Sequence, residues 1–111
     1  MYEVYLITNS VNGKRYVGIT KRGYMQRFNE HKSQAKSGSV NILHCAMRKY
    51  GSDAFSIQII RSGVDEKEIE YFERYYISLY DTYYKNRHGY NMTIGGGGTI
   101  GYVFTKSVRQ K

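Results

Sequence analysis

The sequence predicts an α+β domain: a small three-stranded antiparallel β-sheet flanked by helices, in the order β-β-α-α-β-α. Two observations carry this prediction. Near the start, an Asn-Gly pair separates two short β-prone segments and indicates a hairpin. Farther along, three stretches with helical periodicity surround a single additional strand-like stretch. The 111 residues are enough for one domain with a core of its own.

The hairpin accounts for the first twenty residues. Strands are expected over residues 3–8 and 14–19, with the Asn-Gly pair in the turn between them. Each strand carries one tyrosine, Tyr5 in the first and Tyr16 in the second. The hairpin therefore brings two phenols into the same small sheet.

Two helices are expected next. The first covers residues 22–36, with Thr20 as its N-cap and a Ser-Gly-Ser stretch at its end. The second covers residues 42–50, with Asn41 as its N-cap and Gly51 as its stop.

The third strand is expected over residues 54–60, where apolar and polar side chains alternate. Asp65 and Glu68 have the spacing of a capping box, which predicts that the last helix runs from there to about Tyr80. The glycine-rich stretch 88–98 is expected to be a loop.

The domain boundary is expected at the end of this loop. Residues 1–98 form the predicted domain, and residues 99–111 form a basic tail or the start of a linker.

Charge points to a polyanionic partner. The formal net charge is +8. Between residues 14 and 49 there are nine lysines and arginines against one acid, Glu30. A basic surface that serves only solubility is the alternative, but the charges are clustered in regions and not interspersed. The single cysteine, Cys45, excludes an internal disulfide and suggests a reducing compartment.

Arg27 and His31 lie four residues apart and therefore share one face of the first predicted helix. Two cationic groups in this arrangement are useful if an anion binds beside them. The alternative for His31 is that it borders the core, because it follows Phe28 by three residues.

Glu73 falls on the face of the last predicted helix that also carries Ile69 and Tyr76. A carboxylate directed inward is costly unless it is paired, hydrogen-bonded or bound to a metal. One interpretation is a buried ion pair with a cation such as Arg27. The favoured one is a divalent metal, since hard oxygen ligands suit Mg²⁺.

Asn91 lies in the sequence Gly89-Tyr90-Asn91, just before the run of glycines. Its amide can fix an irregular backbone, and the neighbouring glycines allow a ligand to approach closely. Both roles, pinning this loop and contacting a phosphate, stay open.

These motifs together resemble the GIY-YIG nucleases, most of all the catalytic domains of phage and intron homing endonucleases. The co-linear matches are Val4-Tyr5-Leu6, Tyr16-Val17-Gly18, Arg27 with His31, Lys49-Tyr50-Gly51, Glu73, and Gly89-Tyr90-Asn91. The name motif departs from the family pattern, with Glu-Val-Tyr for Gly-Ile-Tyr and Tyr-Val-Gly for Tyr-Ile-Gly. Both tyrosines and the glycine are present.

The resemblance implies a DNA endonuclease that uses one Mg²⁺ or Mn²⁺, held by Glu73. It also implies the residues around the scissile phosphate: Tyr5, Tyr16, Arg27, His31 and Asn91. Further substrate contacts are expected from Gly18, Lys14, Lys21, Arg22 and Lys49.

Individual roles follow from the same resemblance. Tyr5 is the expected general base, with Tyr16 orienting the water or the phosphate. His31 relays the proton, Arg27 neutralises charge on the phosphate, and Gly18 leaves room for the metal or the phosphate. A free phenol has a pKa of about 10, so a tyrosine base needs nearby positive charge.

The expected partner is double-stranded DNA, and no association with a membrane is expected. The oligomeric state stays open. The expected location is the cytoplasm of a bacterial or phage-infected cell. Two other functions remain: a structure-specific repair nuclease of the same superfamily, and a non-catalytic module that binds nucleic acid.

Overall fold

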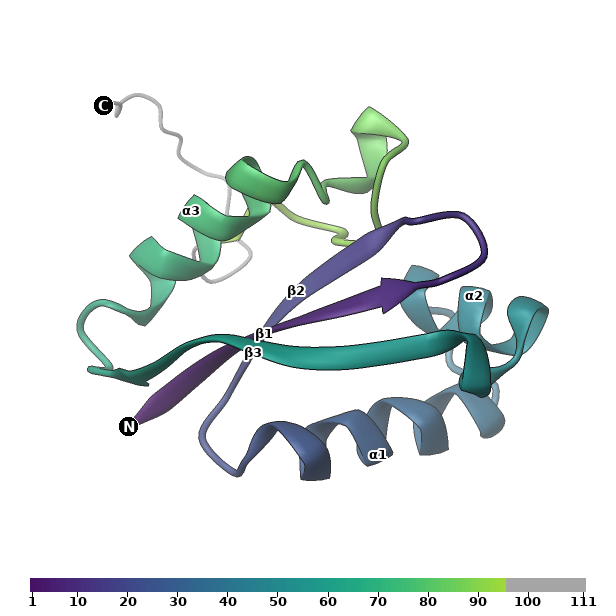
Figure 1. Ribbon diagram of the computed structural model, residues 1–111, viewed down its shortest axis with the longest axis horizontal. Helices are drawn as coiled ribbons and strands as arrows, with labels where there is room; N and C mark the ends of the chain where they lie inside the picture. Colours follow the sequence, from purple (N-terminus) through teal and green to yellow (C-terminus); the bar gives the residue numbers. More distant parts are fainter. Residues whose placement is uncertain (96–111) are drawn as a thin grey trace.

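A computed structural model describes residues 1–95 of the chain. The elements follow the predicted order, and the three strands form one antiparallel sheet with the order β2-β1-β3 (Figure 1). The predicted fold class is confirmed. The expected domain boundary at residue 98 lies outside the described residues.

The central strand β1 (Tyr2–Asn9) pairs with β2 (Arg15–Thr20) on one side and β3 (Phe55–Val64) on the other. Alternation along β1 directs Tyr5 and Ile7 into one hydrophobic cluster and its other core residues into a second.

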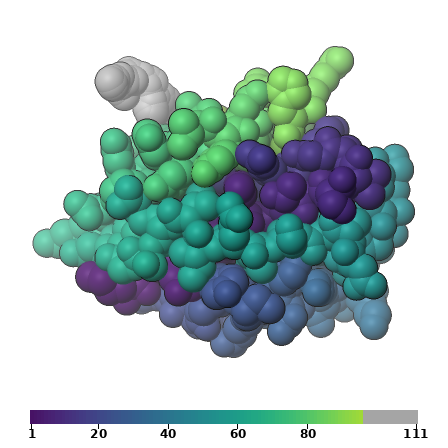
Figure 2. All heavy atoms as spheres, viewed as in Figure 1, coloured from purple at the N-terminus to yellow at the C-terminus, as the bar shows by residue number. Residues whose placement is uncertain are grey.

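Helices cover both faces of this sheet (Figure 1). Helix α1 (Tyr24–Lys36) and helix α2 (Ile42–Tyr50) pack on the Tyr5 face, whereas α3 (Ile69–Tyr80) packs on the opposite face. Seen from outside, β3 crosses the molecule between α1 and α3 (Figure 2). Both faces of β1 are therefore buried. Helix α3 lies mainly against β2, and α1 lies mainly against α2 and β3.

Two predicted features of the first helices have different outcomes. In α2, Asn41 is the N-cap, its side chain accepts a hydrogen bond from the Leu43 amide, and Gly51 follows the helix, as predicted. Thr20 is not the cap of α1, which begins at Tyr24 after Gly23. The Thr20 hydroxyl instead accepts from the Arg22 amide and closes a local turn, as serine and threonine often do outside helices.

The last helix begins later than the capping-box spacing predicts. The carboxylate of Asp65 accepts from the Lys67 amide, and the Glu68 amide donates to the Asp65 carbonyl. These bonds close a separate turn, so α3 starts at Ile69. Strand β3 also extends to Val64, beyond the expected end at residue 60. No helix among residues 1–95 is both long and apolar enough to cross a membrane.

Candidate active site

Three aromatic rings from three elements meet on the α1 face of the sheet. Tyr5 lies on β1, Tyr16 on β2 and His31 on α1. The His31 ring stands edge-on to both phenols, with ring centroids 6.1 Å from Tyr5 and 5.4 Å from Tyr16. The phenol rings are 6.4 Å apart. The structure thus brings together both hairpin tyrosines and the histidine that the sequence singled out.

The absence of a side chain at Gly18 leaves the space that the Tyr5 ring occupies. It lies directly opposite Tyr5 in the β1–β2 pairing. A Cβ atom added at Gly18 would lie only 2.2 Å from Cζ of Tyr5 and 2.3 Å from its hydroxyl oxygen. The space expected to accommodate a metal or a phosphate is therefore occupied by the phenol, and that expectation for Gly18 is corrected.

A chain of hydrogen bonds leads from Tyr5 toward the surface. The Tyr5 hydroxyl is 2.8 Å from Nε2 of His31, and Nδ1 of His31 is 2.8 Å from Nε2 of His44 on α2. Nδ1 of His44 is in turn 2.7 Å from the hydroxyl of Ser39. A neutral imidazole has one N–H donor and one acceptor, so all three bonds can run in the same direction. His31 is nearly fully buried, but as a link in a polar chain and not as simple core.

Burial opposes ionisation of both phenols. It raises the pKa of Tyr5, and the neighbouring Tyr16 raises it further, while the Arg27 guanidinium acts in the opposite direction. Burial likewise raises the pKa of Tyr16, again with Arg27 opposing. Positive charge is present as expected, but it does not bring either phenol within reach of neutrality. Burial therefore favours the neutral phenol of Tyr5 near neutral pH.

His31 is held neutral. Burial lowers its pKa to about 3, with further contributions from Arg27 and His44. The pKa of His44 is lowered too, by burial and by the guanidinium groups of Arg27 and Arg48. A neutral imidazole can accept a proton, which a permanently charged one cannot.

This shift predicts acid sensitivity. The unfolded chain binds a proton at His31 near pH 6.5, whereas the folded chain binds it only near pH 3. Protonation therefore favours the unfolded chain, and the free energy of unfolding falls as the pH drops from 6.5 toward 3. The expected loss of folding stability between pH 7 and pH 4.5 is about 2–3 kcal/mol. Urea unfolding at pH 7 and pH 4.5 should show a smaller loss in His31→Gln than in the parent. Equal losses in both proteins would contradict the neutral buried state.

Arg27 is held at the site by Glu30. Its guanidinium is 3.1 Å from the Glu30 carboxylate, which also receives two hydrogen bonds from Arg22 at 2.7 and 2.8 Å. Arg27 is only partly exposed and interacts with both phenols. Arg22, an expected substrate contact, is thus already paired with a carboxylate.

Glu73 of α3 is half-buried and reaches the same region from the other face of the sheet. Its negative charge acts in the same direction as burial and raises the pKa of both Tyr5 and Tyr16. Helix α3, which carries Glu73, packs against the edge strand β2, which carries Tyr16. A single half-buried carboxylate is a suitable donor for Mg²⁺, which keeps several waters and takes further oxygen ligands from phosphates.

Asn91 clamps the outer edge of β2. Its side-chain oxygen accepts from the Val17 amide at 2.8 Å and from the Thr82 hydroxyl at 2.7 Å, and its amide donates to the Val17 carbonyl at 2.8 Å. Val17 lies between Tyr16 and Gly18. Of the two roles left open, the structure therefore shows the structural one: Asn91 positions the strand that carries Tyr16.

The clamp predicts a large stability effect. Asn91→Ala leaves two buried backbone groups of Val17 and the Thr82 hydroxyl without their partner, so we expect a loss of about 3 kcal/mol. Asn86→Ala, which removes one exposed bond to Asp81, is the control and should cost less than about 1 kcal/mol. Thermal or urea unfolding measures both. Similar losses in the two variants would mean that the clamp contributes little.

The other expected substrate contacts are spread over the surface. Lys21 lies 3.9 Å from Glu66 and over the Tyr2 ring, and Lys49 lies over the Tyr50 ring. Lys14 is at the end of the hairpin connection, where its carbonyl accepts from the Asn9 amide. These contacts lie on three different parts of the fold.

Sequence reasoning missed His44 and Ser39. His44 is thirteen residues from His31, and only the packing of α1 against α2 brings the two rings together. One signal was present: His44 sits among apolar residues on the buried side of a well-predicted helix. A buried histidine there required a partner.

Comparison with known proteins agrees with this arrangement. The profile of the GIY-YIG catalytic domain matches residues 1–91. The chain is 31% identical over 108 residues to the endonuclease candidate segE of Enterobacteria phage T4, covering 97% of this chain and 47% of that protein. It is also 31% identical over 112 residues to the probable intron-encoded endonuclease 1 of Neurospora crassa, covering 97% of this chain and 35% of that protein. The chain therefore spans less than half the length of these curated relatives.

A solved structure shows the same fold. The catalytic domain of the homing endonuclease I-TevI superposes with a TM-score of 0.71 at 24% identity, covering 84% of this chain and 99% of that one. The fold is an α+β domain with a cluster of two tyrosines and a histidine on one face of its sheet. The chain belongs to the GIY-YIG family, as its motifs predicted.

Proposed function

We propose that this domain is a metal-dependent DNA endonuclease that hydrolyses phosphodiester bonds, similar to homing endonucleases. The observation that carries the proposal is the convergence of Tyr5, Tyr16, His31, Arg27 and Glu73 from both faces of one sheet. Phosphate hydrolysis needs a base for water, a cation for the phosphate and a site for a metal. These five side chains offer all three.

Tyr5 acts as the base through a relay. Because burial disfavours a free phenolate, the Tyr5 oxygen takes a proton from the attacking water as its own proton passes to Nε2 of His31. The Nδ1 proton of His31 can move on to His44, which is hydrogen-bonded to Ser39. His31 begins neutral and is therefore able to accept.

The remaining groups handle charge and position. Arg27 faces both phenols and neutralises developing charge on the phosphate. Tyr16 orients the water or the phosphate, and Asn91 keeps the Tyr16 strand in place. Glu73 would hold Mg²⁺ or Mn²⁺, which when bound supplies Lewis-acid polarisation of the phosphate.

The substrate that we propose is double-stranded DNA, bound mainly through its phosphates. The net charge of +8 supports this proposal, and binding should weaken steeply as salt rises. The same proposal includes a boundary of the catalytic domain near residue 98, followed by a basic tail. It also includes a location in the cytoplasm.

The testing experiment is conversion of supercoiled plasmid to nicked and linear forms with Mg²⁺, with Mn²⁺ and with a chelator. Cleavage with either metal that stops with the chelator supports the proposal. Plasmid binding without cleavage under all conditions favours the binding module. A strong preference for branched over linear duplexes of equal length favours the repair nuclease.

A further inference from the structure

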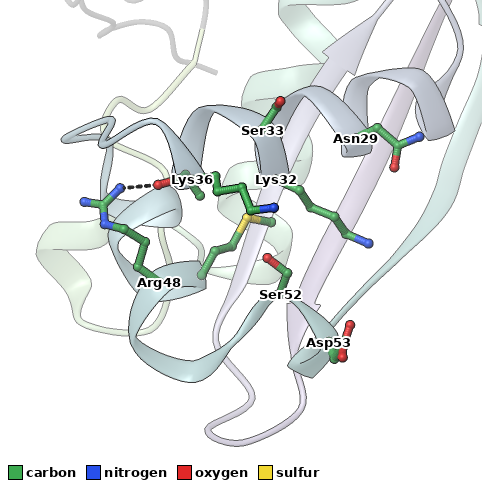
Figure 3. Close-up of a pocket in the computed structure, with 9 residues that line it drawn as sticks. Asn29, Lys32, Ser33, Lys36, Arg48, Ser52 and Asp53 are labelled. Carbon is green, nitrogen blue, oxygen red and sulfur yellow. Dashed lines mark hydrogen bonds between the residues drawn. The ribbon is translucent and has the colours of Figure 1, made fainter.

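A second polar pocket lies between α1, α2 and the short 3₁₀ helix η1 (Ser52–Ala54), away from the tyrosine site. Its volume is about 460 Å³, within the usual range of ligand pockets. Figure 3 shows Lys32 and Lys36 extending from α1 on the side of Ser52, with Arg48 reaching α1 from α2. The polar residues of its lining are Asn29, Lys32, Ser33, Lys36, Arg48, Ser52 and Asp53.

The pocket and the candidate active site use opposite flanks of α1. At about 100° of rotation per residue, Lys36 lies about 180° around the helix from Arg27, and Lys32 about 140°. Arg27 and His31 serve the tyrosine site, whereas Asn29, Lys32 and Lys36 line the pocket. A ligand in the pocket is therefore bound separately from the reacting phosphate.

The charges of the pocket suit an anion. Lys32, Lys36 and Arg48 contribute three cations against one carboxylate, that of Asp53. Within residues 1–95, the salt bridges of the structure involve none of these three cations. The cations therefore remain able to bind an external anion.

Two of these cations are held in place before any ligand arrives. One guanidinium nitrogen of Arg48 donates to the Ala35 carbonyl at 2.7 Å, in the last turn of α1, and another approaches the Cys45 sulfur at 3.4 Å. The Lys32 ammonium lies over the Phe28 ring, 4.3 Å from its centre. Fixed cations lose less freedom on binding than mobile surface lysines do.

We propose that this pocket binds a backbone phosphate of the DNA duplex at a distance from the scissile bond, and so anchors the duplex along α1. The inference rests on the proposed function. Lysine and arginine charges, with neutral donors from Ser33, Ser52 and Asn29, are the groups that contact phosphates without reading bases. The pocket thus contributes affinity and position, and no sequence preference.

The test is a double variant, Lys32→Gln with Lys36→Gln, which keeps most of each side chain and leaves Arg48 in its hydrogen bond. Binding to a fluorescent duplex of about 20 base pairs is measured without metal, from about 50 to about 200 mM salt. We expect about tenfold weaker binding at the low end, and a slope of log affinity against log salt that is smaller by about 1 to 2. Unfolding curves confirm that the variant is folded.

The matched control is Lys67→Gln with Lys85→Gln, which removes the same charge from exposed positions outside the pocket. Equal effects of the two double variants on affinity and slope would overturn the proposal, because the loss would then reflect the lower net charge alone. Binding of inorganic phosphate is measured in the same proteins at constant ionic strength. If the Lys32 and Lys36 variant loses phosphate binding but keeps the parental affinity for the duplex, the pocket is a site for free phosphate and the proposal fails. Failure of the parent protein to bind or cut any DNA would instead refute the proposed function.

Discussion

Glu73→Gln is expected to abolish metal-dependent plasmid cleavage, with a loss of at least about 10³-fold in rate, while the domain stays folded. The change keeps the shape of the side chain and removes the negative charge that hard cations require. Cleavage is measured in single turnover with Mg²⁺ and Mn²⁺, and folding by thermal unfolding. Measuring the cleavage rate against metal concentration separates weaker metal binding from a slower chemical step.

Two comparisons make this result interpretable. Glu70→Gln removes a charge from an exposed position three residues earlier on α3, and it should cut at nearly the parental rate. If Glu73 serves instead as the half-buried partner of a cation, its replacement should lower the melting temperature clearly and leave DNA binding intact. Full cleavage by a folded Glu73→Gln protein would exclude the carboxylate from the reaction.

Gly18→Ala is expected to damage both stability and cleavage, although it adds only one methyl group. The added carbon would lie 2.2 Å from Cζ and 2.5 Å from Cε1 of Tyr5, a ring that is 1% exposed and has little room to move. We expect a destabilisation of about 2–3 kcal/mol. Displacing the ring also breaks its bond to His31, so cleavage should fall about 10²–10⁴-fold.

A double-mutant cycle tests the steric cause. Gly18→Ala in a Tyr5→Ala background should cost at least about 1 kcal/mol less than in the parent, because the ring that it meets is gone. The backbone at Gly18 is outside the left-handed region, so conformational strain does not explain a loss there. Additive effects of the two changes would show that the methyl group is harmful for a reason other than Tyr5.

Local chemistry was sufficient for most of the fold. The Asn-Gly pair lies in the turn as predicted, because Gly13 adopts a positive φ of 76° that glycine tolerates. Helix α2 begins after Asn41 and ends before Gly51, as predicted. The Asn41 side chain satisfies an amide at the start of the helix, and the Gly51 amide satisfies a carbonyl at its end. The start of α3 was wrong for a related reason: Asp65 can cap a helix or close a turn, and its immediate neighbours do not distinguish the two.

By itself, then, the sequence determined the order of the elements, the family and the side chains capable of the chemistry, because caps, turns and alternation act between near neighbours. Only the tertiary structure decided how those side chains are used. The Tyr5 ring fills the space at Gly18, His44 continues the chain from His31, and Asn91 holds Val17 across 74 residues. Burial also decided their protonation, since the pKa of a phenol or an imidazole depends on the groups that fold around it.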